Sequence, residues 1–180
     1  EFYVCYEAGA SGTYILGGGT LSTNGMEIGH DGPGLLQQSG GSHFVNNNRC
    51  VSITGEDGQH GTYEMSGGYF RGNLAVGGQL THIGGRVVSE LLKIYSYPST
   101  ASQEATYEVA GTGFLDAVNV HISGGERSGE TSEGRLIQDG PDTTVSVSRK
   151  LYVDDRGTYE LRNGTLSVST LCLENGLVHQ

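Results

Sequence analysis

Apolar and polar residues alternate along most of the chain in short stretches that are separated by Gly and Asn. A clear example lies near the C-terminus, where the sequence is TYEL at 158–161, TLSV at 165–168 and LCL at 171–173. A period of two is typical of β-strands with one buried face, and Gly or Asn between strands indicates turns that need a positive φ. Residues 89–95 come nearest to a helical period, but they are few enough for a strand or a single turn. The pattern therefore predicts an all-β chain in which each unit has three short strands.

Two short strings alternate along the sequence. One contains Gly-Thr-Tyr or Ala-Thr-Tyr, as at 12–14, 61–63, 105–107 and 157–159, and the other contains Leu-x-Gln or Leu-x-His, as at 36–38, 80–82 and 136–138. The units start at Gly12, Gly34, Gly61, Gly78, Ala105, Gly134, Gly157 and Gly176, with a mean spacing of about 23 residues. Self-similarity at such a period indicates stacked repeats. We expect one domain over residues 1–180, a single-stranded β-solenoid (parallel β-helix) of about seven coils.

The phase of the repeat predicts which side chains form the core. One equivalent position should point inward in every coil, and it holds Tyr14, Leu36, Tyr63, Leu80, Tyr107, Leu136 and Tyr159. Two residues further on, apolar residues alternate with Gln38, His82, Gln138 and Gln180. Buried amides need hydrogen-bond partners, so we expect an internal ladder of bonds to turn carbonyls and amides. The alternative is a polar channel or a row of ligand contacts.

Composition excludes several classes of protein. The net charge of −10 argues against a nucleic-acid-binding protein, which needs a basic face to displace phosphate counterions. No apolar run approaches the roughly 20 residues of a membrane-spanning helix. Glycine accounts for 31 of 180 residues without the three-residue period of collagen. Polar, Gly-rich chains are often disordered, but the ordered repeat favours a folded chain.

Written as Gly-x-Tyr-x-Leu-x-Gly-Gly alternating with Gly-x-Leu-x-Gln-Ser-Gly-Gly, the sequence resembles the Gly-rich solenoid repeats of large secreted bacterial proteins. These repeats occur in autotransporter-type passengers and in PEP-CTERM-associated surface proteins. The resemblance is clearest over 12–21, 26–41, 61–70 and 157–168. It implies an extracellular or cell-surface location and a role as a rigid stalk, an adhesin or a self-assembling fibre or matrix subunit. It implies no catalytic residue, and we expect a protein that is not an enzyme.

Two parts of the sequence depart from the repeat. Between residues 84 and 103 a strand after Val88 is followed by a longer tail with Pro98, and residues 124–133 are long and polar. We expect both segments to contain loops that bulge from one edge of the solenoid. The sequence also begins and ends within a coil, without a capping element. Because an open solenoid end is an unpaired sheet edge, we expect either continuation in a longer chain or self-association through the open ends.

Acidic residues precede most unit starts, and Asp31, Asp57, Glu133 and Asp155 represent this set. If adjacent coils align them about 4.8 Å apart, they form a carboxylate stripe along one corner. Hard cations prefer carboxylate and carbonyl oxygens, so calcium is the one candidate cofactor. The alternative is a row of solvated turn residues that keeps the chain soluble.

Two further classes of function compete with a structural role. A glycan-binding module would use Tyr69, Tyr95 or Tyr97 as outward stacking platforms. A polysaccharide-degrading enzyme would need carboxylates on neighbouring coils of one outward face. Asp116 and His121 lie in one coil with an acid and an arginine at 126–127, but no second coil supplies a clear matching acid.

The three cysteines are predicted to form no intramolecular disulfide. Cys5 and Cys50 are about two coils apart, roughly 10 Å, and Cys172 is five coils further. A disulfide requires Cα atoms within about 7 Å. Cys172 lies between two inward leucines and should face outward.

Overall fold

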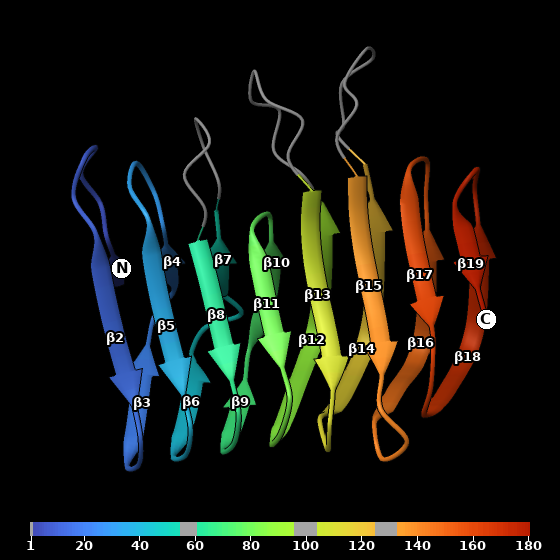
Figure 1. Ribbon diagram of the computed structural model, residues 1–180, viewed down its shortest axis with the longest axis horizontal. Helices are drawn as coiled ribbons and strands as arrows, with labels where there is room; N and C mark the ends of the chain where they lie inside the picture. Colours follow the sequence, from blue (N-terminus) through green and yellow to red (C-terminus); the bar gives the residue numbers. More distant parts are fainter. Residues whose placement is uncertain (1, 55–60, 96–103, 125–132) are drawn as a thin grey trace.

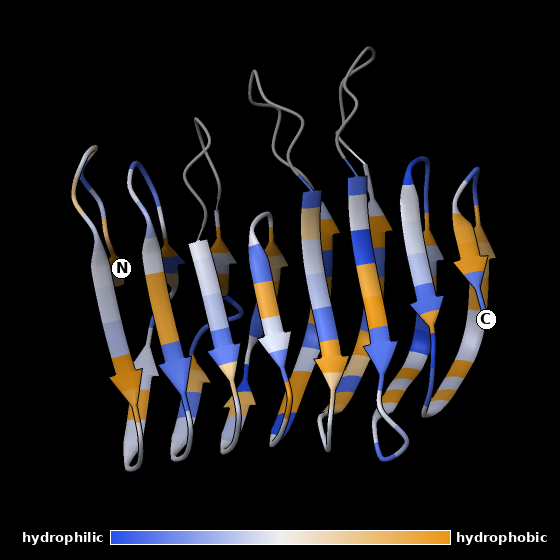
Figure 2. Ribbon diagram, viewed as in Figure 1, coloured by the Kyte–Doolittle hydropathy of each residue, from blue (hydrophilic) through white to orange (hydrophobic). Residues whose placement is uncertain are grey.

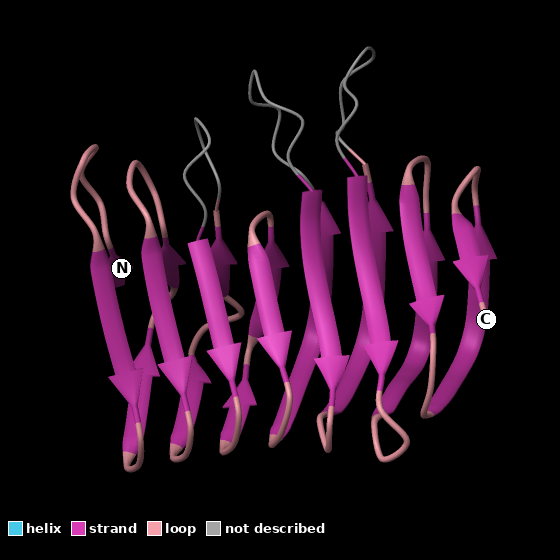
Figure 3. Ribbon diagram, in the orientation of Figure 1, coloured by secondary structure: helices cyan, strands magenta, loops and turns pink. Residues whose placement is uncertain are grey.

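The computed structural model describes residues 2–54, 61–95, 104–124 and 133–180. Every regular element within these residues is a β-strand (Figure 3). The fold is therefore all-β, as the alternating pattern predicts. None of the described residues belongs to a helix of membrane-spanning length and hydropathy.

One sheet contains a single strand from each unit. Its strands are β2 (Gly12–Leu16), β5 (Gly34–Gln38), β8 (Gly61–Met65), β11 (Gln79–His82), β13 (Glu104–Ala110), β15 (Glu133–Asp139), β17 (Gly157–Leu161) and β19 (Leu177–His179). Each strand pairs in parallel with the strand of the next unit, so the order in space is the order in sequence (Figure 1). We call this the eight-stranded sheet.

The second sheet lies behind the first in Figure 1. Its main path is β1 (Phe2–Val4), β4 (Met26–Ile28), β7 (Cys50–Ile53), β10 (Asn73–Val76), β12 (Arg86–Tyr95), β14 (Phe114–Ser123), β16 (Thr144–Val153) and β18 (Thr165–Leu173). Three further strands, β3 (Thr20–Thr23), β6 (Ser42–Val45) and β9 (Tyr69–Arg71), pair with one another and with the first half of β12. All the pairings are parallel. We call this the eleven-stranded sheet.

The chain passes through the two sheets in turn, and we call one such pass a rung. The expected three strands per unit occur in the rungs that begin with β2, β5 and β8. From β11 onward a rung has two strands, because the two short strands of the eleven-stranded sheet are replaced by one strand of nine or ten residues. The expectation of three strands therefore fails in the later rungs.

The long strands keep a bend, which is visible in the spacing of their buried side chains. In β14, Leu115 and Ala117 are buried in the first half, and Val120 and Ile122 in the second half. The step of three between Ala117 and Val120 breaks the period of two and marks the bend that the short strands make with a turn. Backbone pairing continues through the bend, and the register shifts there between β14 and β16.

The strand expected after Val88 within 84–103 is present, although it begins earlier, at Arg86. Residues 86–95 form β12, which pairs with β14 along most of its length. Residues 96–103 lie outside the described part of the chain, as do 125–132 within the second predicted loop.

The core lies between the two sheets and agrees with the predicted phase. Register places the predicted Tyr and Leu side chains opposite one another on consecutive strands. Tyr63, Tyr107 and Tyr159 are at most 1% exposed, whereas Tyr14, on the first strand of its sheet, is half-buried. The alternation of apolar and polar residues is visible along the strands in Figure 2.

The glycines that start the units allow the two sheets to meet closely. A Cβ atom at Gly61 would lie 2.0 Å from the backbone oxygen of Ile28, and one at Gly157 would lie 2.3 Å from the backbone oxygen of Ile122. Both contacts are with backbone, which cannot rotate away as a side chain can. Glycine therefore fits these close approaches, and the row also contains the fully buried Ala105 in β13.

His43 is the one polar member of an otherwise apolar column. Register aligns it with Leu21 on one side and Phe70 on the other, and it is fully buried. Its Nε2 atom lies 3.3 Å from the hydroxyl of Thr23, and its Nδ1 atom has no hydrogen-bond partner among the residues that the structure describes. Burial lowers the pKa of His43 to about 4.

Replacing His43→Leu together with Thr23→Val should leave stability at pH 7 unchanged or raise it by about 1 kcal/mol, because both polar partners are removed together. The gain should increase as the pH falls from 6.5 towards 4, since the unfolded wild type binds a proton there that the folded protein excludes. Urea unfolding at pH 7 and pH 5 measures both effects. Thr23→Val alone leaves the imidazole unpartnered and should destabilise by about 1–3 kcal/mol; a neutral effect would contradict this account.

Candidate functional site

Three buried polar side chains form a row inside the molecule. Gln38, His82 and Gln138 occupy the same position in β5, β11 and β15, and each is at most 1% exposed. In the intervening rungs register places Met65, Val109 or Leu161 there. At this buried position, polar and apolar side chains therefore alternate from rung to rung.

Each polar side chain binds the tyrosine of the following rung. The hydroxyl of Tyr63 donates to Oε1 of Gln38, and the hydroxyl of Tyr159 donates to Oε1 of Gln138 at 2.5 Å. The Nε2 atoms of the two glutamines donate to backbone oxygens on the same following rungs, at Tyr69 (3.1 Å) and Thr165 (3.0 Å). Burial raises the pKa of Tyr63 and of Tyr159, so both hydroxyls remain protonated donors.

His82 also binds the tyrosine of the following rung, but its backbone contact is with its own rung. Its Nε2 atom lies 3.1 Å from the backbone oxygen of Gly85, which can only accept, so Nε2 holds the proton. Its Nδ1 atom therefore accepts from the hydroxyl of Tyr107 at 3.1 Å. Burial lowers the pKa of His82 to about 4, which favours the neutral ring that this geometry needs.

The predicted internal ladder is confirmed, and the partners include the expected turn carbonyls. Sequence reasoning missed the tyrosine hydroxyl. The signal was present in the strict alternation of Tyr rungs with Gln or His rungs, offset by two residues. Because the polar atoms of the row bind within the protein, the structure gives no support to a channel or ligand row.

Charged side chains bridge rungs on the outer face of the eight-stranded sheet. Arg135 contacts Glu104 at 2.6 Å and Glu160 at 2.9 Å, and Arg162 contacts Glu160 at 2.9 Å. Glu104 belongs to the acidic residues that precede unit starts and pairs in register with Glu133. Arginine therefore neutralises part of this acidic row.

The residues of the predicted calcium stripe are not brought together as a cluster. Asp31, Glu133 and Asp155 are exposed beside β5, β15 and β17, and Asp57 lies outside the described residues. Within the described ranges, no group of three or more His, Cys, Asp or Glu side chains could hold a metal ion. The calcium stripe remains a prediction.

The predicted aromatic platforms are separated. Tyr69 is half-buried on β9 and pairs with Arg86 at the start of β12, whereas Tyr95 is the last residue of β12. Nine residues of strand span roughly 30 Å. Tyr97 lies outside the described part of the chain. Tyr69 instead lies beside Phe44, with ring centroids 5.9 Å apart.

The three thiols are free. Cys172 pairs in register with Tyr152 on β16, and its neighbours Leu171 and Leu173 pair with the buried Leu151 and Val153. Cys172 therefore alternates to the outside, as predicted.

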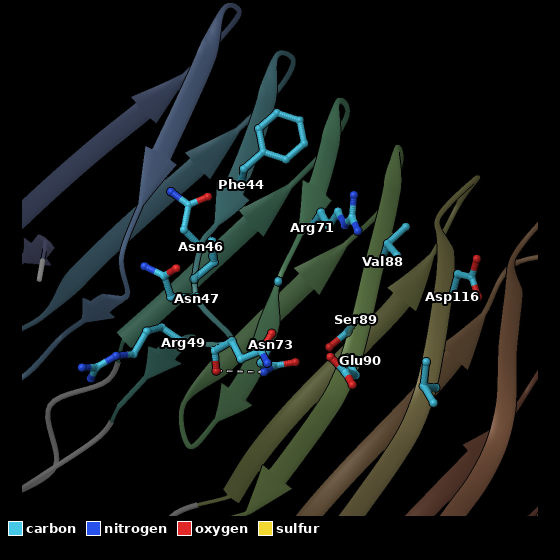
Figure 4. A pocket seen from close by; sticks show the side chains of 14 residues that line it. Phe44, Asn46, Asn47, Arg49, Arg71, Asn73, Val88, Ser89, Glu90 and Asp116 are labelled. Atoms are coloured by element: carbon cyan, nitrogen blue, oxygen red, sulfur yellow. Dashed lines mark hydrogen bonds between the residues drawn. The ribbon is translucent and has the colours of Figure 1, made fainter.

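A groove follows the bend of the eleven-stranded sheet, and we call it the bend groove. It encloses about 580 Å³ and is lined by residues 44–49, 71–73, 88–90, 116 and 118 (Figure 4). It exists because the connection at the bend differs between rungs. Residues 46–49 protrude between β6 and β7, a single Gly72 joins β9 to β10, and β12 has no interruption.

The protruding turn is well defined. Asn47 and Asn48 have φ angles of 59° and 54°, a left-handed conformation that Asn tolerates. Asn46 is tied to the preceding rung through its backbone nitrogen, which donates to Thr23 O at 2.8 Å. Asn73 on the groove floor donates to Asn48 O at 3.2 Å and accepts from the backbone nitrogen of Leu91 at 3.0 Å.

The groove has polar groups that the rest of the described protein does not satisfy. The side chains of Arg71 and Glu90 are exposed and have no hydrogen-bond or ion-pair partner among the described residues. Ser89 is only 2% exposed, and its hydroxyl has no partner there either. Asp116 accepts from Arg86 at 2.7 Å. Sequence reasoning did not find this groove, although the run of three asparagines at 46–48 signals an unusual turn.

A scan against protein-family models finds no match for the chain, and searches of curated proteins and of solved structures also find none.

Removing the hydroxyl in Tyr107→Phe should destabilise the protein by about 1–3 kcal/mol, because Nδ1 of His82 is left buried without a donor. Urea unfolding measures the change. Tyr14→Phe is the matched control, since the Tyr14 hydroxyl has no partner among the described residues, and it should change stability by less than about 0.5 kcal/mol. Equal effects of the two substitutions would show that the hydroxyl-to-imidazole bond is not what stabilises the rung pair.

The variant His82→Gln should fold with near wild-type stability at pH 7, because glutamine makes the same contacts in two other rungs. Wild-type stability should fall as the pH falls from 6.5 towards 4, since the unfolded chain takes up a proton at His82 that the folded chain excludes. In the variant the free energy of unfolding should depend less steeply on pH, by up to about 1.4 kcal/mol per pH unit. Unfolding curves at half-unit pH steps measure the difference, and identical slopes would contradict the assignment.

Proposed function

We propose that this chain is a β-solenoid segment with a structural, non-enzymatic role outside the cell, as a rigid stalk or as a subunit of a self-assembling fibre or matrix. The observation that supports this proposal most directly is the unbroken parallel pairing of the eight-stranded sheet from β2 to β19. Each rung pairs only with the rungs before and after it. Such an arrangement lengthens by adding rungs and leaves its cross-section unchanged.

The internal row supports a rigid spacer. A tyrosine hydroxyl connects each Gln or His rung to the next one from inside the core, and in the two Gln rungs one backbone oxygen of the next rung is bound as well. These contacts are buried, so neither water nor a ligand competes for them. The stacking direction is thereby held by side chains as well as by the backbone.

The two outermost rungs support assembly through sheet edges. β2 and β19 each have one sheet neighbour, and β18 is likewise the last strand on its path. Leu171 and Leu173, which point to the core side of β18, are 43% and 54% exposed. A parallel edge with an apolar inner face accepts a further strand, whether from the same chain or from a second copy. The extracellular location rests on the resemblance of the Gly-rich repeats to those of secreted bacterial proteins.

Deleting residues 34–77 tests the modular proposal. This change removes two rungs, β5 to β10, and joins a Tyr rung to the His82 rung, so the alternation is preserved. The shortened protein should unfold in one cooperative transition. Its sedimentation coefficient should fit a body shorter by two rung spacings of about 4.8 Å each.

Deleting only residues 61–77 is the matched control. It removes the rung that contains Tyr63, so Gln38 lies next to His82 without a tyrosine hydroxyl between them. Because buried polar groups then lack partners, the midpoint of thermal unfolding should fall by at least about 5 °C relative to the two-rung deletion. Equal tolerance of both deletions, or failure of both to fold, would contradict the proposal. Sedimentation of the full chain over a range of concentrations separates a fibre subunit, which lengthens, from a spacer, which does not.

A further inference from the structure

We infer that the bend groove binds a neutral oligosaccharide. This inference rests on the groove alone and is independent of the structural role proposed above. The groove crosses β6, β9, β12 and β14, which belong to four consecutive rungs. Its long direction therefore follows the stacking axis. Consecutive rungs are about 4.8 Å apart, close to the length of one hexose unit, so successive rungs present side chains to successive sugars.

The size and rigidity of the groove suit a small ligand. A volume of about 580 Å³ lies within the range of roughly 300–1,000 Å³ that is typical of small-molecule sites. The floor is preorganised, because both polar atoms of the Asn73 side chain are held by backbone groups. The rim is the turn at 46–49, which is tied to the preceding rung. A ligand would therefore need little rearrangement of the protein.

The unsatisfied groups match the chemistry of sugar hydroxyls. A hydroxyl donates one hydrogen bond and accepts others, so it can link a guanidinium donor to a carboxylate acceptor. Arg71 and Glu90 supply such a pair, and Figure 4 shows them on adjacent rungs of the groove. At the exposed rim the side-chain amide of Asn46 donates to Ser22 Oγ at 2.9 Å and that of Asn47 to Asn24 Oδ1 at 3.5 Å, so the preceding rung already holds these two side chains.

Ser89 borders the groove from the core side of β12. It alternates with Val88 and Glu90 and pairs in register with the buried Ala117. Its hydroxyl therefore does not face a ligand in the groove, and the inference rests on the exposed side chains of the groove.

One end of the groove is aromatic. Phe44 is half-buried there, and its ring packs at a tilt against Tyr69. An aromatic face of this kind covers the apolar C–H face of a pyranose ring. Such a face lies beside amides and beside Arg71 and Glu90, which have no partner among the described residues, and this combination is typical of neither an apolar ligand nor a metal ion.

Charge favours a neutral sugar over an acidic one. The groove contains Glu90 and Asp116 as well as Arg49 and Arg71, and Asp116 is already paired with Arg86. The whole chain has a net charge of −10. A polyanion would therefore meet repulsion at long range.

The test is an NMR titration of the full chain with cellotetraose, mannotetraose and chitotetraose, and with tetragalacturonic acid as the anionic counterpart. At least one neutral tetrasaccharide should bind and shift the backbone amide signals of residues 46–49 and 71–73. Arg71→Ala and Glu90→Gln should each weaken that binding by at least about tenfold, since each removes a hydrogen bond to a charged group.

Arg149→Ala is the matched control, because Arg149 is also exposed on the eleven-stranded sheet but lies outside the groove. This variant should bind as the wild type does. The inference would be overturned by binding of none of the three neutral tetrasaccharides, by binding of tetragalacturonic acid alone, or by equal losses in Arg71→Ala and Arg149→Ala. None of these outcomes bears on the rung-deletion experiment, so the two proposals fail separately.

Discussion

The structure depends on a tyrosine hydroxyl that must find an acceptor inside the core. Backbone pairing alone does not fix how one rung lies on the next. A slip of one residue would turn the apolar face outward and is excluded by burial, but a slip of two residues would keep every side chain on its own face. The bonds from Tyr63 to Gln38 and from Tyr159 to Gln138 form only in the observed register. A slip would leave buried polar groups unpaired, so these contacts select one alignment.

The inner and outer faces of the rungs are under different constraints. Inside, the tyrosine and glutamine rows and the recurring glycines leave almost no freedom, because backbone oxygens and buried hydroxyls surround them. Outside, Arg135 bridges Glu104 and Glu160, but these side chains are partly exposed and such pairs contribute little to stability. The outer surface and the bends can therefore vary without loss of the fold, and the bend groove arises from such variation.

The all-β class, the units and the inward rows could be predicted from the sequence, because they depend on a local period of two repeated at a regular spacing. Tyr63, Tyr107 and Tyr159 are buried as that phase requires. The fusion of two short strands into β12, β14, β16 and β18 could not be predicted in this way, since a break in alternation marks a bend equally well with or without a turn. The bend groove arises because neighbouring rungs have connections of different length at the bend. This difference appears only when the rungs are aligned in space, so the sequence of a single rung does not predict the groove. The bond between His82 and Tyr107 could have been predicted from the sequence, but only by considering diagonal neighbours on adjacent strands as well as residues directly opposite.

The direction of the strands determines how the molecule would respond to mechanical load. Every strand runs across the stacking axis, and the backbone bonds between parallel strands lie along that axis. A pulling force applied at the two ends would load the bonds of the outermost strand one after another instead of shearing a whole ladder at once. The chain would then peel open stepwise, and each step would release the length of one repeat and relax the tension before the next rung is loaded.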